Sequence, residues 1–246
     1  MAHRHNIYVV RHGESLATLD PTLFGRMNPE YVPLSQWGYD QIVEAGKACR
    51  AHHDATNTGK PLDIFHSHHL RIVQSKDGFL QGFGTGQTTP ARSDKRLGER
   101  VHGQFDGLDQ AAQKELDPKI FGKLHSPIAR LRFMTRMPDG ESMQDVQSRL
   151  ESFLEEYVMK PHEDKSIVIL THGGNCRVIE NILTHERATW LYNDTPPGTG
   201  DILFIPRIGN QPGTSSTLFE GRKRPSTMPK DYKTAEYDPH KGIIIA

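Results

Sequence analysis

Residues 7–15 read Ile7-Tyr8-Val9-Val10-Arg11-His12-Gly13-Glu14-Ser15, and this stretch decides the fold. Its apolar, β-branched beginning predicts a buried strand. Arg11 and His12 follow where that strand ends, and open α/β sheets bind ligands outside the carboxyl ends of their strands. The stretch therefore predicts a sheet, and it also predicts the edge of the sheet at which a binding site lies.

Strand-like and helix-like segments alternate along the rest of the chain. The other apolar runs typical of buried strands are Leu62–Phe65, Ile167–Leu170 and Ile202–Ile205. Segments with a helical spacing of apolar residues are 35–50, 70–80, 142–158 and 174–183. This alternation predicts an α/β three-layer sandwich, with a mostly parallel central sheet and helices on both of its faces.

The composition excludes several classes of protein. The chain has 246 residues, with 30 Lys and Arg against 30 Asp and Glu, so it has no general attraction to nucleic acid or to an anionic membrane. No apolar run approaches the length of a bilayer span, and the start lacks a signal-peptide pattern. Cys49 and Cys176 lie in apolar helical patterns, which predicts buried free thiols. We expect a cytoplasmic protein without nucleic-acid or membrane partners. The composition is compatible with a homo-oligomer.

Two regions depart from the alternation. Residues 101–138 have weaker periodicity and interrupt it, which indicates an insertion within a catalytic domain spanning 1–206. Residues 207–246 are polar and rich in proline, which predicts an extended or partly disordered tail. Within that tail, Arg222-Lys223-Arg224 is expected to be a solvated run of charge.

The apolar run Ile167–Leu170 is followed, like the first, by a histidine and a glycine. It continues as Thr171-His172-Gly173-Gly174 before a helical pattern begins. Two histidines, each at a strand end and each followed by glycine, can meet across adjacent strands. Glycine lets the backbone approach a ligand closely, and the N-terminus of the following helix offers free N–H groups to an anion. We therefore expect His12 and His172 to flank an anion.

Five landmarks in register resemble the histidine phosphatase superfamily, whose members look like cofactor-dependent phosphoglycerate mutase. The first is Arg11-His12-Gly13-Glu14-Ser15. The others are the segments Tyr31–Gly38, which holds Pro33-Leu34-Ser35, Phe65–Ser75, Leu97–Gly107 and Pro138–Ser142. The resemblance covers roughly residues 5–205. It implies the phosphoglycerate mutase-like fold, with the insertion lying over the active site.

The resemblance also implies a role for each central residue. His12 would be the nucleophile that forms a phosphohistidine. Arg11 and Arg71 would clamp the phosphoryl oxygens, and His172 would donate a hydrogen bond to one of them. Glu99 would be the general acid and then the general base. No metal or cofactor is implied, because the arginines and the histidine supply the positive charge.

Other residues enter these predictions around that centre. Contacts to the substrate are also expected from Ser15, Thr18 and Gly173. Only its register in the motif selects Glu99, because Asp94, Asp106 and Glu115 are alternative carboxylates nearby. The histidines of the motif His66-Ser67-His68-His69 have no carboxylate or cysteine set close in sequence. They are therefore expected to be solvated or rim residues rather than zinc ligands.

Three functions compete on this evidence. The favoured one is a phosphomonoesterase for a small phosphorylated metabolite, similar to the small phosphatase branch of the superfamily. The second is a phosphoglycerate mutase, which would need a cationic clamp for its sugar acid. The insertion lacks the Arg-Arg-Ser-Tyr run of the mutases, although Arg130, Arg132 and Arg136 could bind an anionic tail. The third is a catalytically silent module that binds a phosphorylated ligand.

Overall fold

The computed structural model describes residues 4–56, 61–84, 86, 88, 90–159, 165–185, 196–208, 211, 213–226, 236–238 and 242–244. At its centre lies a mixed sheet of six strands in the order β3-β2-β4-β1-β5-β6. The strands are β1 (Arg4–Arg11), β2 (Leu62–His66), β3 (Arg92–Ser93), β4 (Lys165–Thr171), β5 (Ile202–Ile208) and β6 (Ser216–Phe219). The first four in that order run parallel, whereas β5 is antiparallel to both of its neighbours. The predicted α/β class is confirmed.

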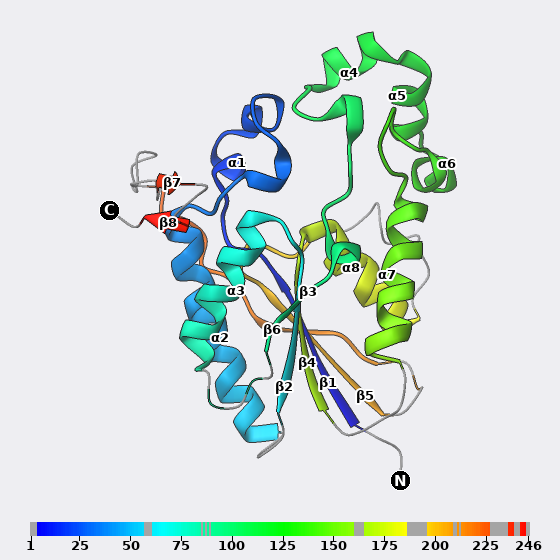
Figure 1. The fold of residues 1–246 in the computed structure, drawn as a ribbon. Helices are drawn as coiled ribbons and strands as arrows, with labels where there is room; N and C mark the ends of the chain where they lie inside the picture. Colours follow the sequence, from blue (N-terminus) through cyan, green and yellow to red (C-terminus); the bar gives the residue numbers. More distant parts are fainter. Residues whose placement is uncertain are drawn as a thin grey trace.

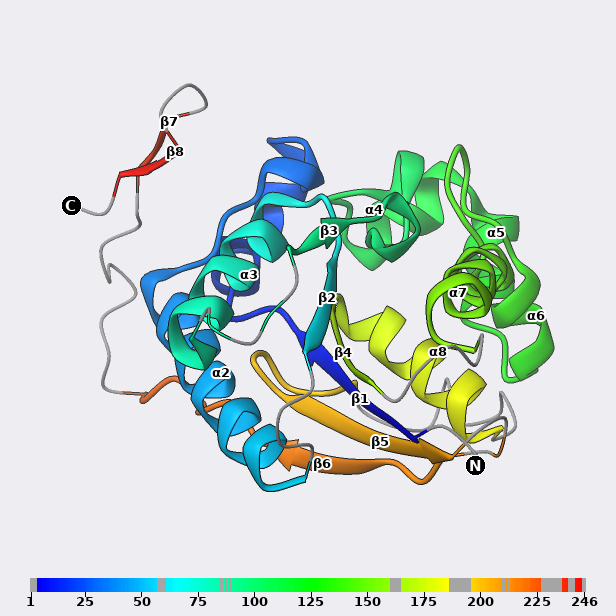
Figure 2. The ribbon, with the colours of Figure 1, turned by 60° about the horizontal axis from the view of Figure 1, so that its bottom comes forward.

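Helices cover both faces of this sheet (Figures 1 and 2). One face carries α2 (Gln36–Thr56) and α3 (Leu70–Phe83), and the other carries α7 (Met143–Tyr157) and α8 (Gly173–Thr184). Alternate residues of β1 enter the two cores: Ile7 and Val9 pack with α7 and α8, while Tyr8 and Val10 pack with α2 and α3. Because the side chains of residues 7–10 in β1 and 166–171 in β4 are buried on both faces of the sheet, these central strands read as continuous apolar runs.

The connections from β1 and β4 leave these neighbouring strands in opposite directions. The chain passes from β1 through α2 to β2, and from β4 through α8 to β5, on opposite faces of the sheet. Such a reversal opens a crevice at the carboxyl ends of the two strands. Residues Arg11 and Thr171 pair in register at this end, so the residues that follow them, His12 and His172, enter the crevice together.

Short helices surround the crevice. Between β1 and α2 lie α1 (Leu16–Leu19) and the 3-10 turns η1 (Pro21–Gly25) and η2 (Pro29–Tyr31). After β3 come the turns η3 (Lys95–Leu97) and η4 (Gly103–Phe105). The predicted insertion then contains α4 (Gln110–Leu116), α5 (Pro118–Leu124) and α6 (Ala129–Met134). Figure 1 shows these three helices at the same end of the molecule as α1, beyond the carboxyl ends of the strands.

Part of the predicted tail belongs to the sheet. β5 continues to Ile208, and β6 at 216–219 pairs with it as an edge strand. Beyond this, β7 (Glu236–Asp238) and β8 (Gly242–Ile244) form a separate two-stranded sheet. Arg224 corrects the expectation of a solvated charge run, because its side chain is only 13% exposed and contacts Glu14 at 2.7 Å. The division into a catalytic domain and a tail at residue 206 stays a prediction.

The sequence placed the main elements within a few residues, and the largest difference is α2, which runs six residues beyond the expected end at 50. Cys49 and Cys176 are both buried and free, as expected. Among the described residues, no helix combines the length and apolarity that crossing a membrane requires.

Candidate active site

His12 and His172 lie side by side at the carboxyl ends of β1 and β4. Their ring centroids are 5.5 Å apart, and the His12 N–H donates to the Thr171 carbonyl across the strand boundary at 3.1 Å. The expected meeting of the two histidines is therefore observed. Arg71, Glu99 and Arg11 lie around the pair, so the structure brings all five predicted central residues to one site.

The backbone carbonyl of Gly13 sets which nitrogen of the His12 ring carries the proton. Nδ1 of His12 lies 2.7 Å from the Gly13 carbonyl oxygen, and because a carbonyl can only accept, Nδ1 carries the proton. The lone pair is thus on Nε2. Burial, together with Arg71 and Arg11, lowers the pKa of His12 well below its ordinary value. The imidazole is consequently neutral near pH 7, as a nucleophile requires.

His172 is fully buried and held at both ring nitrogens. Its Nε2 lies 3.1 Å from Ser67 Oγ. Its Nδ1 lies 3.2 Å from Arg71 Nη2 and 3.3 Å from Glu99 Oε2. Burial is the main cause that lowers the pKa of His172, with Arg71 and His12 adding to it. Ser67 therefore orients a neutral ring whose Nδ1 side faces the same space as Arg71 and Glu99.

Arg11 presents an unsatisfied cationic group. Its Nη1 donates to the Pro197 carbonyl at 2.5 Å, whereas its buried Nε has no hydrogen-bond partner among the described residues. The guanidinium lies against Gly173, where an added Cβ would approach Arg11 Nε to 3.1 Å and Cζ to 3.2 Å. A buried donor without a partner is costly. Gly173 thus lets a cation with spare donor capacity lie against the start of α8.

Arg71 is the most deeply buried charge of the site, with 2% of its side chain exposed. It is the second residue of α3, and its Nη1 donates to the Pro29 carbonyl at 2.7 Å. Its Nη2 lies 3.7 Å from Glu99 Oε2. A buried arginine fork next to a histidine and a carboxylate suits a planar or tetrahedral oxyanion.

The start of α8 at the site lacks the side-chain cap found at the start of α7. In α7, the Ser142 hydroxyl accepts from the Asp145 N–H, and the Asp145 side chain accepts from the Ser142 N–H. In α8, the corresponding residue is His172, whose side chain makes no capping bond. The first N–H groups of α8 are therefore not satisfied by a side chain, and the positive end of the helix dipole lies beside Arg11. An anion would satisfy both.

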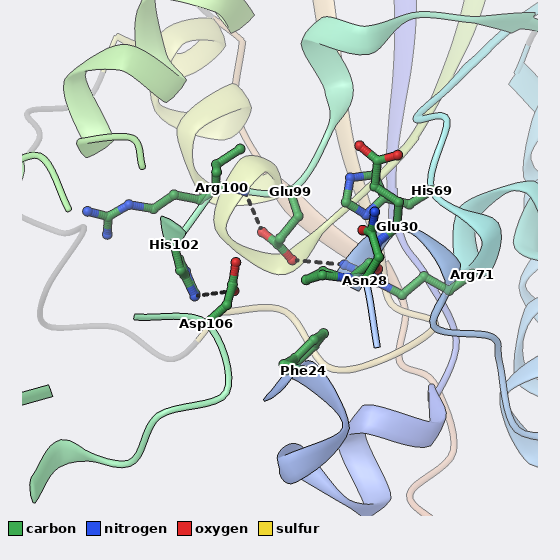
Figure 3. Close-up of a pocket in the computed structure, with 11 residues that line it drawn as sticks. Phe24, Asn28, Glu30, His69, Arg71, Glu99, Arg100, His102 and Asp106 are labelled. Carbon is green, nitrogen blue, oxygen red and sulfur yellow. Dashed lines mark hydrogen bonds and ion pairs between the residues drawn. The ribbon is translucent and has the colours of Figure 1, made fainter. Parts of the chain in front are cut away.

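Glu99 bridges the inner site and the wider pocket (Figure 3). Its Oε1 accepts from the Arg100 N–H at 3.2 Å, and its Oε2 contacts Arg71 and His172. One oxygen of Glu99 and one ring nitrogen each of His12 and His172 lie within 4.8 Å of one another. Its side chain is 30% exposed, so it can reach both buried groups and solvent.

The alternative carboxylates to Glu99 differ from it in their positions. Asp94 caps η3 and binds Arg96 at 2.6 Å, and Glu115 is exposed on α4. Asp106 lines the same pocket as Glu99, and burial raises its pKa, against the influence of His102. Only Glu99 lies with both histidines, which favours it over Asp106 as the group that exchanges protons with the substrate.

Ser15 and Thr18 have structural tasks in the molecule. They form the capping box of α1, with the Thr18 N–H donating to Ser15 Oγ and the two hydroxyls 3.1 Å apart. Ser15 is buried, whereas Thr18 is exposed. Their predicted contacts to a substrate stay predictions.

The pocket beyond the inner residues is lined from two segments. The turns η1 and η2 contribute Phe24, Pro29 and Glu30, together with Asn28, which caps η2. The loop before the insertion helices contributes Arg100, Val101, His102 and Asp106. Figure 3 shows Phe24 across the pocket from Glu99, and the Arg100 side chain directed away from Arg71. The Arg100 side chain donates to the Glu141 carbonyl at 3.0 Å, so it is held by the loop after α6.

The three arginines of the insertion make contacts outside the pocket. Arg132 donates to the Ser126 carbonyl, and Arg136 binds Asp145 at 2.5 Å. The nearest partner of Arg130 is the Met134 sulfur. None of the three lines the pocket just described, so the suggestion that they bind an anionic substrate tail receives no support from their positions.

Two residues near the site were missed or misjudged from the sequence. The sequence pattern assigns no role to Ser67, although its hydroxyl contacts His172 Nε2 at 3.1 Å. It predicts His69 at the rim or in solvent, but His69 is buried, and its ring packs 4.7 Å from that of His172. Burial, with Arg71 adding to it, lowers the pKa of His69 to about 3. His66 is also buried, whereas His68 is partly exposed.

Residues 7–196 match the model of the histidine phosphatase superfamily (branch 1). The chain belongs to this superfamily. Its curated relatives include the phosphoglycerate mutase-like protein AT74H of Arabidopsis thaliana, which is 27% identical over 70% of this chain. That match spans 63% of the relative's own length. A 2,3-bisphosphoglycerate-dependent phosphoglycerate mutase of Methanococcus vannielii is 26% identical over 71% of this chain and 79% of its own.

Solved structures of this superfamily share the fold. YhfR of Bacillus stearothermophilus superposes with a TM-score of 0.65 at 20% identity, covering 89% of this chain and 98% of its own. A mycobacterial glucosyl-3-phosphoglycerate phosphatase superposes with a TM-score of 0.61 at 20% identity, covering 89% and 100%. At these identities the likeness establishes the phosphoglycerate mutase-like fold.

Proposed function

We propose that the protein is a metal-independent phosphomonoesterase that hydrolyses a small phosphorylated metabolite through a phosphohistidine on His12. The observation that carries this proposal is the convergence of a neutral, buried His12 with two arginines, His172 and the uncapped start of α8. These groups surround a space suited to a phosphoryl group, and Glu99 stands at its open side. Relatives and structural neighbours are named as mutases and as phosphatases, so the choice between the two rests on the pocket.

The first step is a displacement at phosphorus. His12 Nε2 attacks the phosphorus atom while the bond from phosphorus to the ester oxygen breaks, and Glu99 donates a proton to the leaving oxygen. Arg11, Arg71 and the N–H groups of α8 stabilise charge on the equatorial oxygens. Because these donors are fixed by burial before the reaction, they need little reorganisation when charge develops.

Ser67 sets the tautomer of His172 in this account. Its Oγ accepts from the His69 N–H at 3.3 Å, which leaves the hydroxyl hydrogen free to be donated to His172 Nε2. The proton of His172 then lies on Nδ1, where Glu99 Oε2 at 3.3 Å can accept it in the free enzyme and a phosphoryl oxygen can accept it in the complex, while Arg71 donates to the substrate instead.

The second step returns the enzyme to its starting state. A water molecule attacks the phosphorus of the phosphohistidine, Glu99 accepts a proton from that water, and the bond from phosphorus to Nε2 breaks. Inorganic phosphate and neutral His12 result. A water molecule needs access for this step, and the partial exposure of Glu99 provides it.

The outer pocket favours hydrolysis over the mutase reaction. A mutase holds a carboxylate-bearing sugar acid, which calls for cationic side chains around the leaving group. Here the part of the pocket beyond the inner residues, its outer wall, carries the carboxylates Glu30 and Asp106. The side chain of Arg100 is held by the Glu141 carbonyl. A catalytically silent binding module is disfavoured because every chemical group that the reaction requires is present.

The deciding experiment compares two reactions on one sample. We expect release of phosphate from p-nitrophenyl phosphate, unchanged by EDTA, and no interconversion of 3- and 2-phosphoglycerate. Interconversion faster than phosphate release would establish the mutase instead. If the wild type binds inorganic phosphate but catalyses neither reaction, the protein is the silent binding module.

A further inference from the structure

Outside the inner site, two imidazoles and a carboxylate gather at the edge of the pocket. Glu30 comes from η2, while His68 and His69 come from the loop between β2 and α3. One ligand atom from each of the three lies within 4.8 Å of the other two. Glu30 is 38 positions away from His68 in the sequence and reaches the two histidines only through the fold.

The nitrogens of this cluster are poorly satisfied. Nδ1 of His68 and Nδ1 of His69 are both buried without a hydrogen bond of good geometry, although the Pro29 carbonyl lies beside the His69 ring. The His69 side chain is 6% exposed and lines the pocket. In His68 it is the opposite nitrogen, Nε2, that faces Glu30, so this nitrogen is placed to hold a ligand together with that carboxylate.

The spacing of the cluster approaches that of a metal site. His68 Nε2 and Glu30 Oε1 are 3.2 Å apart. Two ligands of a tetrahedral zinc ion, each about 2.0–2.1 Å from the metal, are about 3.3 Å apart. The Glu30 side chain is 48% exposed, so its rotation can close the remaining separations.

We propose that Glu30, His68 and His69 bind a divalent zinc ion that inhibits the enzyme. Two imidazoles and one carboxylate are a donor set that zinc accepts and that magnesium and calcium do not prefer. Since Glu30 and His69 line the same pocket as Arg71 and Glu99, the ion narrows the space for the leaving group. Inhibition rests on the proposed phosphatase function, whereas binding of the ion does not.

The test measures binding and inhibition separately, with Zn²⁺ itself as the probe. The chain has 14 histidines, so the readout is the difference between variants rather than total uptake. The wild type is expected to bind one zinc ion more than His68→Gln does, as measured by calorimetry. His125→Gln, on the far end of α5, is the matched control and retains that ion. Glu30→Gln is expected to weaken its binding at least about tenfold.

The activity assay supplies the second readout. His68 does not line the pocket, so His68→Gln is expected to keep the basal rate while the Zn²⁺ concentration for half inhibition rises at least about tenfold. Mg²⁺ is expected to have no effect. Equal binding and equal inhibition in the wild type and His68→Gln would overturn the proposal and place the ion on His12, Glu99 and His172. No zinc binding by the wild type would also overturn it. If the wild type shows no phosphatase activity but still binds one zinc ion more than His68→Gln does, only the proposed function is refuted.

Discussion

The inner and outer walls of the pocket are built in opposite ways. The inner wall consists of His12, His172, Arg11 and Arg71, which stand at strand ends and helix starts. Three of these side chains are almost fully buried. The outer wall consists of Phe24, Glu30 and Asp106 among others, which stand on short turns and on the loop leading into the insertion. The inner wall is cationic or neutral, whereas the outer wall mixes carboxylates with Arg100.

This difference indicates that the residues of the inner wall perform the reaction, while those of the outer wall select the substrate. The inner wall is fixed by the sheet, since the hydrogen bond from His12 N–H to Thr171 O and the contact of Gly173 with Arg11 leave little freedom. The outer wall is held by local contacts, such as that between Arg100 and the Glu141 carbonyl. Changes to the inner wall should therefore abolish turnover, while changes to the outer wall should alter which ester is accepted.

The largest effect is expected from His12→Ala. Without the nucleophile, hydrolysis of p-nitrophenyl phosphate should fall at least about 10³-fold, because the covalent route is lost. Steady-state rates measure this, and circular dichroism checks the fold. Residual activity within tenfold of the wild type would show that the inner wall does not act through this residue.

A matched pair of arginines compares the two walls directly. Both Arg71 and Arg100 line the pocket. Arg71→Gln should lower kcat at least about 10²-fold, in the range for removing one donor to a developing oxyanion. Arg100→Gln should change kcat less than about tenfold and act mainly on KM. Similar losses in kcat for the two variants would erase the distinction between the walls.

The two pocket carboxylates can be separated by their response to the leaving group. Glu99→Gln should slow an alkyl phosphate about 10²-fold, and p-nitrophenyl phosphate much less, because nitrophenolate leaves without a proton. Asp106→Asn should affect both esters alike and weakly. If Asp106→Asn instead showed the selective loss, the general acid would belong to the outer wall.

The smallest expected effect concerns stability and pH. Burial holds the pKa of His12 and His172 below the ordinary value in the native state, so the unfolded chain binds more protons as the pH falls below about 6.5. The unfolding free energy should then decrease by up to about 1.4 kcal/mol per pH unit for each buried ring. Urea unfolding at about pH 7 and pH 5 measures the slope, which should be shallower in His12→Ala. An unchanged slope would mean that His12 titrates normally when folded.

The inner wall could be predicted from the sequence for a physical reason. A strand buried on both faces reads as a continuous apolar run, so the polar residues that end it, Arg11, His12 and His172, stand out. Arg71 and Glu99 lie in no such context, and only the resemblance to the superfamily located them. Their meeting with the histidines depends on where α3 and the loop after η3 pack.

The outer wall could not be predicted because its contacts join distant segments without a local pattern. Glu30 reaches His68 through η2, and Arg100 reaches the Glu141 carbonyl across 41 positions. The tail was expected to be extended or partly disordered because it is rich in proline and glycine, yet its residues 216–219 find a partner in β5. An edge strand needs only one neighbour, so its sequence carries little of the periodicity by which strands are recognised.

The measurement that tests the central claim most directly is the trapping of the covalent intermediate. The enzyme is mixed with a phosphate ester, quenched within one turnover under alkaline conditions that preserve phosphohistidine, and digested for mass spectrometry. The account predicts one phosphoryl group on the peptide that contains His12, located on the imidazole. Completion of a turnover without phosphorylated protein, or a phosphoryl group on another residue, would contradict it.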